Sequence, residues 1–118
     1  MSFKDILAWQ KAHDLCVFVY QDFRSCKDYA FKDQVQRAAV SVMNNIAEGH
    51  AKRSDKSFKS FLLISKGSLA EVQSMLILAV SLGYLDKNTA TERFDLAEET
   101  ARILSGLIKK LSSQINEG

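Results

Sequence analysis

Four basic residues lie within eight positions near the middle of the chain: Lys52, Arg53, Lys56 and Lys59. They flank the predicted start of a helix, with Ser54 among them. Backbone N–H groups and the helix dipole at such a start favour an anion, and lysine and arginine side chains bind phosphate oxygens. The pattern therefore indicates a surface for a nucleic-acid backbone, and Arg37 on the preceding helix is a fifth candidate contact.

A solvated loop and helix end would explain the same four residues without any ligand. Asp55 lies inside the cluster, and the net charge of the whole chain is only +2. For a monomer this second interpretation is the better one, whereas an oligomer would repeat the cluster in every subunit and add the charges into one field. The sequence identifies no exposed aromatic residues for base stacking. Any binding of RNA or DNA would therefore follow the backbone, with little sequence preference.

Residue patterns typical of enzymes and metal sites are missing from the sequence. The five glycines are scattered, so no glycine-rich loop is present for a nucleotide phosphate. His13 and His50 lie in different segments without a nucleophile motif beside them. His13 and Cys16 have the spacing of a metal-binding pair, but no second pair accompanies them, and no Glu-x-x-His sequence occurs. We therefore predict a protein that is not an enzyme and holds no metal or other cofactor.

The composition is that of a single globular domain. The chain has 118 residues, of which 47% are hydrophobic and 25% charged, and this suffices for one core. Its most apolar stretch, 61–85, is interrupted by Lys66 and Glu71, which argues against a membrane span, and no signal peptide is evident. We expect one cytoplasmic domain over residues 1–118, with both cysteines as free thiols and no contact with a membrane.

Four segments with helical periodicity must position these residues. They run from about Lys4 to Ser25, from Lys32 to Glu48, from Ser54 or Asp55 to Leu82, and from Asp86 or Thr89 to about Ile115. The absence of proline allows helices of this length. Three short breaks between four long helices predict an all-α, antiparallel, up-down-up-down four-helix bundle of left-handed form.

The expected helix ends depend on glycine and on capping side chains. Gly49 is expected to take the left-handed conformation directly after the second helix, and Gly83 to do so after the third. Thr89 and Glu92 have the spacing of a capping box for the fourth helix. In the first helix the apolar stripe is expected to run through Ile6, Trp9, His13, Cys16, Val17, Tyr20 and Phe23.

The second and third helices have more apolar residues than one core-facing stripe needs. In the second, the core stripe is expected to be Val35, Ala38, Ala39, Val42 and Ile46, and in the third it is expected to be Phe58, Phe61, Leu62, Ser65, Leu69, Val72, Leu76 and Ala79. A helix that is central in its own bundle would explain the surplus, but a four-helix bundle has no central helix. Because so much apolar surface on a monomer would promote aggregation, we predict a homo-oligomer. The expected interface consists of Val40, Met43, Ala47, Leu63, Gly67, Ala70, Ser74, Ile77 and Leu78.

Several strings of residues resemble one protein family. The clearest are Arg37-Ala38-Ala39-Val40-Ser41 and Asn45-Ile46-Ala47-Glu48-Gly49, and they are joined by Trp9-Gln10-Lys11-Ala12, the stretch 61–71 and Gly83-Tyr84-Leu85. In this order they resemble the 23S ribosomal RNA intervening-sequence protein family, small bacterial four-helix bundles often encoded inside ribosomal RNA genes. The chain departs from the family at Met43, where proline is usual, and at Val35-Gln36, where Ile-Arg would add one positive charge.

The resemblance implies an assembly and a class of partners. Accessory proteins of diversity-generating retroelements are similar to this family, form basic pentameric barrels, and bind nucleic acid and a reverse transcriptase. The resemblance, and not the residues themselves, therefore implies a pentamer. Two hypotheses follow: an accessory protein that binds RNA or DNA, with a reverse transcriptase or another protein as a further partner, or a protein–protein scaffold without contact to nucleic acid. Salt-sensitive binding of RNA would distinguish the two.

Overall fold

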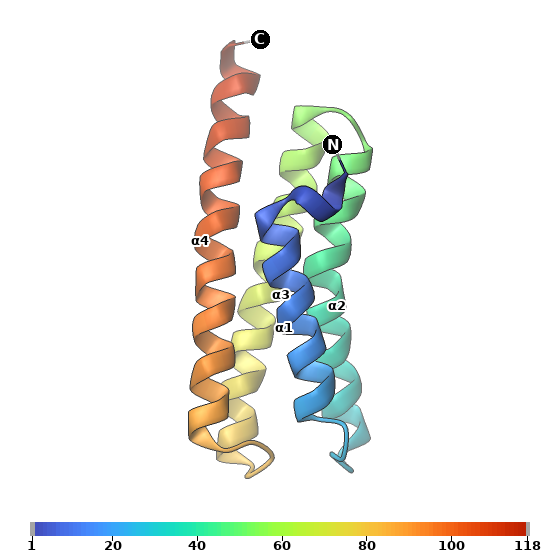
Figure 1. The fold of residues 1–118 in the computed structure, drawn as a ribbon, viewed down its shortest axis with the longest axis vertical. Coiled ribbons are helices and arrows are strands. Elements are labelled where there is room, and N and C mark those ends of the chain that lie inside the picture. Colours follow the sequence, from blue (N-terminus) through green and yellow to red (C-terminus); the bar gives the residue numbers. More distant parts are fainter. Residues whose placement is uncertain (1, 118) are drawn as a thin grey trace.

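The computed structural model describes residues 2–117, and four α-helices contain most of them (Figure 1). The elements are η1 (Phe3–Asp5, a 3-10 helix), α1 (Leu7–Asp22), α2 (Tyr29–Ala51), α3 (Asp55–Ser81) and α4 (Lys87–Glu117). Each helix packs against the next one along the chain, and α4 packs back against α1. The predicted all-α, antiparallel four-helix bundle is confirmed, and no strand forms within the described residues.

The core is a continuous apolar column between the four helices. All five residues of the stripe predicted for α2 are buried, and α3 contributes Leu62, Leu69 and Leu76 from its predicted stripe. The stripe predicted for α1 is correct only in part: Cys16 and Phe23 are buried, and Ile6 and Trp9 pack against the core. The other residues that α1 buries are Ala8, Ala12, Leu15 and Val19, whereas the predicted His13, Val17 and Tyr20 are exposed.

The first helix does not begin at Lys4, because the chain turns before α1. Ser2 caps η1 by accepting a hydrogen bond from the backbone N–H of Lys4, and Ile6 then has an extended backbone. At its other end α1 stops at Asp22, three residues before the predicted end. The second helix begins earlier than predicted, at Tyr29, because the carboxylate of Asp28 caps it. The starts of η1 and α2 thus follow from local capping side chains, whose effect exceeds that of the apolar pattern at these helix ends.

Gly49 does not end α2, contrary to the prediction. It lies buried inside the helix, and a Cβ atom at this position would lie 2.7 Å from Cβ of Phe61 and 2.9 Å from Cδ1 of Phe58. Glycine is needed here because α3 approaches closely. The residue in the left-handed conformation at this turn is Arg53, with φ of 59°. Gly83, with φ of 75°, follows α3 as predicted.

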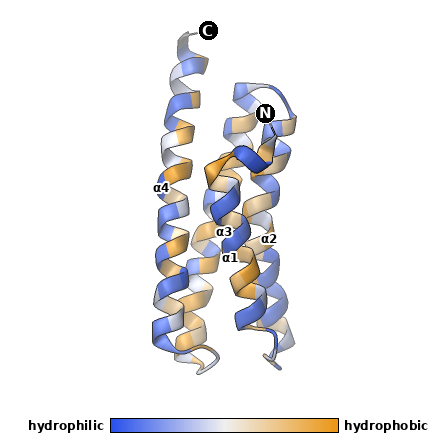
Figure 2. Ribbon diagram, in the orientation of Figure 1, coloured by the Kyte–Doolittle hydropathy of each residue, from blue (hydrophilic) through white to orange (hydrophobic). Residues whose placement is uncertain are grey.

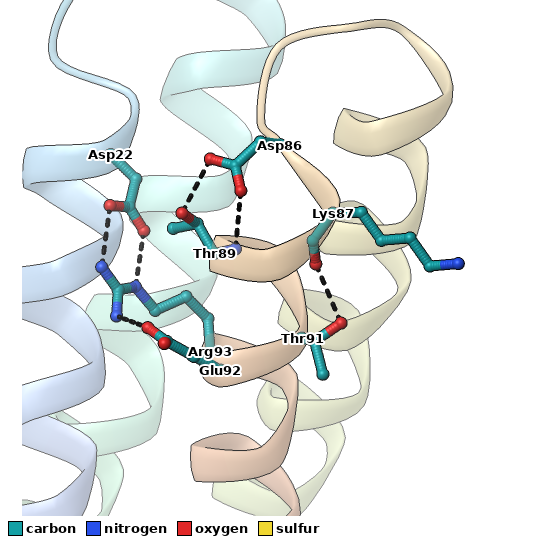
Figure 3. A network of polar contacts seen from close by, with 7 residues as sticks. All are labelled: Asp22, Asp86, Lys87, Thr89, Thr91, Glu92 and Arg93. Carbon is teal, nitrogen blue, oxygen red and sulfur yellow. Dashed lines mark hydrogen bonds and ion pairs between the residues drawn. The ribbon is translucent and has the colours of Figure 1, made fainter.

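The last two helices start at defined caps. Ser54 caps α3 by accepting a hydrogen bond from the N–H of Ser57 at 3.2 Å. Asp86 caps α4 and accepts hydrogen bonds from the N–H and the hydroxyl of Thr89, at 2.9 and 2.7 Å (Figure 3). Thr89 therefore lies inside the first turn, and the predicted capping box with Thr89 as the cap does not form. The third helix continues through Gly67 without a break.

An ion pair joins the short helix α1 to α4 (Figure 3). Arg93 donates from Nε and Nη2 to the two carboxylate oxygens of Asp22, at 2.8 and 3.1 Å. The guanidinium also lies over the ring of Phe18, 4.0 Å from its centroid. Two parallel hydrogen bonds from a planar guanidinium fix both distance and orientation. The pair therefore holds the end of α1 in register with the first turns of α4.

Replacing Gly49 with alanine is expected to lower the free energy of unfolding by up to about 2 kcal/mol. The added Cβ forces α2 and α3 apart, which costs about 1–3 kcal/mol, and the gain in helix propensity of about 1 kcal/mol offsets only part of this cost. Urea denaturation followed by circular dichroism at one protein concentration measures the change.

Gly106→Ala is the matched control, because nothing lies within 4 Å of a Cβ at that helical position. This variant is expected to be more stable than the wild type, by up to about 1 kcal/mol. A Gly49→Ala protein as stable as the wild type would show that α2 and α3 are not in tight contact there.

Candidate nucleic-acid interface

The four predicted basic residues gather at the turn between α2 and α3 (Figure 1). Lys52, Arg53 and Lys56 are exposed, and Lys59 is half-buried in the second turn of α3. None of the four forms an ion pair with an acid in the described part of the chain, although Asp55 lies in the first turn of α3. Their positive charges are therefore not neutralised by neighbouring side chains.

Arg37 is not brought to this turn. It lies near the middle of α2, about 22 Å along the helix axis from Lys52. Its Nε atom donates to Oδ2 of Asp33 at 2.8 Å, one helical turn away. Arg37 is thus a separate, paired charge, and its contact with a nucleic acid stays a prediction.

Two further basic residues lie near the same end of the bundle: Lys109 and Lys110, both exposed on α4. Arg102 lies at the middle of α4, beside Glu98 and Glu99. Because α4 runs antiparallel to α3, its C-terminal half lies at the end that holds the α2–α3 turn (Figure 1). Residues 86–99 contain five acids and two bases, whereas residues 101–116 contain three bases and no acid. This division gives the bundle one basic end. The apolar stripe of α4 does not reveal it, and only the antiparallel packing of α4 brings its last bases toward the α2–α3 turn.

An open hollow of about 650 Å³ lies where the α2–α3 turn meets the start of the chain, and we call it the terminal hollow. It is lined by Ser2, Phe3, Gly49, His50, Ala51, Arg53, Ser54, Asp55 and Phe58. Three of these residues are half-buried rings: Phe3, His50 and Phe58. These rings become neighbours only in the folded chain, because η1 brings Phe3 beside residues that lie far from it in the sequence.

Aromatic neighbours hold the rings and one of the cations in place. His50 packs edge-on to Phe58 with 6.0 Å between ring centroids, and Phe3 packs edge-on to Trp9 at 5.1 Å. The ammonium group of Lys52 lies 5.8 Å from the centroid of Phe61, within the range of a cation–π contact. The basic turn is therefore a structured surface rather than a flexible loop of charges.

A second surface runs along α3, on the side away from the core, and we call it the α3 outer face. It consists of Ser60, Leu63, Ile64, Gly67, Ala70, Ser74, Ile77, Leu78 and Ser81, all exposed. Its four large apolar side chains are between 45% and 60% exposed, and orange residues follow one another along α3 in Figure 2. The acid nearest to this face, Glu71, accepts a hydrogen bond from Gln34 of α2.

The interface residues predicted on α2 lie differently. Val40, Met43 and Ala47 are half-buried, and Val40 and Met43 pack against the core of their own chain. Much of the apolar flank of α2 is therefore covered within one subunit. The interface residues predicted on α3, in contrast, are all exposed in the single chain.

Comparison with known proteins identifies the family. Residues 4–106 match the family model of the 23S rRNA-intervening sequence protein. The chain belongs to this family. Its fold is similar to that of a protein of unknown function from Bacteroides thetaiotaomicron VPI-5482, which belongs to the S23 ribosomal protein family. The two structures have a TM-score of 0.81 and 20% sequence identity. The match covers 87% of this chain and 99% of the other. No curated protein matches the sequence.

Three further observations concern metal ions, membranes and cysteines. Within residues 2–117 no group of three or more His, Cys, Asp or Glu side chains is placed to hold a metal ion. By length and composition alone, α3 is apolar enough to cross a membrane, which is a weak criterion because core helices of other proteins also meet it. Cys16 and Cys26 are free thiols, as predicted, and burial raises the pKa of Cys16.

Because Arg53 has a left-handed backbone conformation, glycine is expected to be more stable than alanine at this position. A residue with a Cβ atom loses about 1–2 kcal/mol in this conformation, whereas glycine does not. We expect Arg53→Gly to be more stable than Arg53→Ala by about 1 kcal/mol, measured by urea denaturation of both proteins. Equal stabilities would mean that the turn relaxes out of this conformation.

Proposed function

We propose that this protein is a non-enzymatic, homo-oligomeric, cytoplasmic accessory protein that binds RNA, or DNA, through the basic end of its helical bundle. The observation that supports this function is the group of four cations without an ion pair at the α2–α3 turn, which two exposed cations of α4, Lys109 and Lys110, extend. Membership of a family named for an intervening sequence of 23S rRNA is consistent with an RNA partner.

The chemistry of such a surface is backbone recognition. Lysine and arginine side chains contact phosphate oxygens, and each contact releases a condensed counterion from the nucleic acid. The contacts carry little sequence information, because the phosphates are the same for every base. With these six cations at the basic end of one subunit, binding by a single subunit would be weak. It would become stronger where several subunits present their basic ends together.

Assembly of several subunits is the second part of the proposal, and the α3 outer face supports it. Four large apolar side chains on one helix, interrupted by the charged residue Glu71, which is hydrogen-bonded to Gln34, form a surface that monomeric proteins rarely expose. Ser60, Gly67, Ser74 and Ser81 recur every seven residues along its centre, and small residues of this kind allow another helix to approach closely. The proposed number of five subunits comes from the family resemblance alone.

Replacing Lys52, Arg53, Lys56 and Lys59 together with glutamine tests the nucleic-acid site. For the wild type, raising the salt concentration from 50 to 200 mM is expected to weaken binding to a duplex by about tenfold or more, with a log–log slope near −0.9 per phosphate contact. The variant is expected to bind more weakly and with a flatter slope, in electrophoretic shifts at the two salt concentrations.

The matched control replaces Arg24, Lys27, Lys32 and Lys87 with glutamine, which removes the same charge from the opposite end of the bundle. It is expected to keep most of the affinity and the salt slope of the wild type. Equal losses of affinity in both variants would mean that only the net charge of the protein matters, and not the position of the cations. Unchanged affinity in the first variant would contradict the proposed site.

Replacing Ala70 or Leu78 with glutamate tests the proposed assembly. A charge buried in an apolar interface without a partner is costly, so these variants are expected to dissociate into monomers with unchanged helicity. Light scattering measures the mass, and Ser105→Glu on the exposed side of α4 is the control. A wild-type protein that is monomeric at micromolar concentration would contradict the assembly.

The alternative function is a protein–protein scaffold that does not contact nucleic acid. The α3 outer face favours it as well, because the face would serve assembly or the docking of a protein partner, such as a reverse transcriptase, whether or not RNA binds. An oligomeric wild type that binds no RNA at 50 mM salt would favour this alternative.

A further inference from the structure

We propose that the terminal hollow binds one unpaired nucleotide of a nucleic-acid strand, with its base against the aromatic rings of the hollow and its phosphate on Arg53. This inference rests on the proposed function and adds to it a preference for single-stranded segments. The backbone surface described above would bind a duplex and a single strand alike, whereas a base enters a hollow only when it is not paired and stacked in a helix.

The size and lining of the terminal hollow suit such a ligand. Its volume of about 650 Å³ lies within the range of about 300–1,000 Å³ that is usual for small-molecule sites. Phe3 and Phe58 present apolar ring surface, and His50 adds a ring that also has polar nitrogen atoms. Stacking on aromatic side chains is a common way in which proteins hold unpaired bases.

The rings need little rearrangement to accept a base. Trp9 packs against Phe3, and Phe58 packs against His50, so neighbouring aromatic groups already restrict both side chains. A ligand that meets restricted side chains loses less conformational entropy on binding. The hollow is therefore a pre-formed site in the single chain.

The polar groups of the hollow have hydrogen-bonding capacity to spare. The Ser54 hydroxyl accepts a hydrogen bond from the N–H of Ser57, at 3.2 Å, and the Ser2 hydroxyl accepts one from the N–H of Lys4, at 3.3 Å. A hydroxyl that accepts in this way still has its own proton to donate. Both hydroxyls can therefore donate to a phosphate oxygen or to an acceptor atom of a base.

Two charged residues of the hollow give the bound nucleotide a direction. Arg53 is exposed, forms no ion pair in the described part of the chain, and can bind a phosphate with two parallel hydrogen bonds. The carboxylate of Asp55 repels a phosphate and accepts hydrogen bonds from a base amino group or a ribose hydroxyl. The phosphate therefore lies on the Arg53 side, and Lys52 and Lys56 flank the path by which the strand continues.

The test uses the full chain and one RNA sequence that contains the fluorescent base 2-aminopurine, either as a single strand or annealed to its complement. At a fixed salt concentration the wild type is expected to bind the single strand more tightly than the duplex and to quench its fluorescence. Phe3→Ala is expected to weaken binding of the single strand by about tenfold and to leave binding of the duplex unchanged. Tyr29→Ala, an exposed aromatic residue at the other end of α2, is the control and is expected to change neither.

A second variant keeps the test decisive if Phe3→Ala disturbs η1. Ala51→Leu adds side-chain volume at an exposed residue that lines the hollow and removes no ring or charge, so it is also expected to weaken only the binding of the single strand. Equal binding of single strand and duplex, unchanged in both variants, would overturn the nucleotide site and leave the proposed function intact. A wild type that binds neither form would overturn both.

Discussion

The close contact between α2 and α3 is the constraint on which the rest of this structure depends. At one end, Gly49 lets Phe58 and Phe61 lie directly against the α2 backbone. Further along, the buried hydroxyl of Ser65 donates to the carbonyl oxygen of Val42 at 2.8 Å, and Ser41 and Ser68 are hydrogen-bonded at 2.8 Å. Small side chains thus allow two long helices to approach, and hydrogen bonds between them set their register.

That contact determines both candidate surfaces. It places the turn with the basic residues at one end of the bundle, beside η1 and the C-terminal half of α4. It also sets the rotation of α3, since the side that holds Ser65 and Leu69 must face the core. The opposite side, with Leu63 and Ile77, is then turned outward, and the other three helices of the same chain leave it exposed. One packing arrangement therefore produces a basic end and an apolar side on the same small domain.

The charges of α4 add to the same polarity of the bundle. Its acids are concentrated in residues 86–99, whereas residues 101–116 contain only bases as charged residues. The ion pair of Arg93 with Asp22 ties the acidic half to α1. The four cations of the α2–α3 turn lie at the opposite end of the bundle and take no part in this ion pair. In this family member, stability and the candidate binding surface do not compete for the same charges.

The sequence by itself determined the helices, the bundle and the buried stripes of α2 and α3. These features depend on apolar spacing within one segment, and that spacing is visible in residues such as Val35 and Ile46 whatever lies around them. The rotation of α1 was not visible, because α1 is apolar on two sides and only its neighbours decide which side is buried. The role of Gly49 was not visible either, since a glycine suits a helix end and a close contact equally well. The terminal hollow was decided by tertiary structure alone, because Phe3 and His50 become neighbours only when the chain folds.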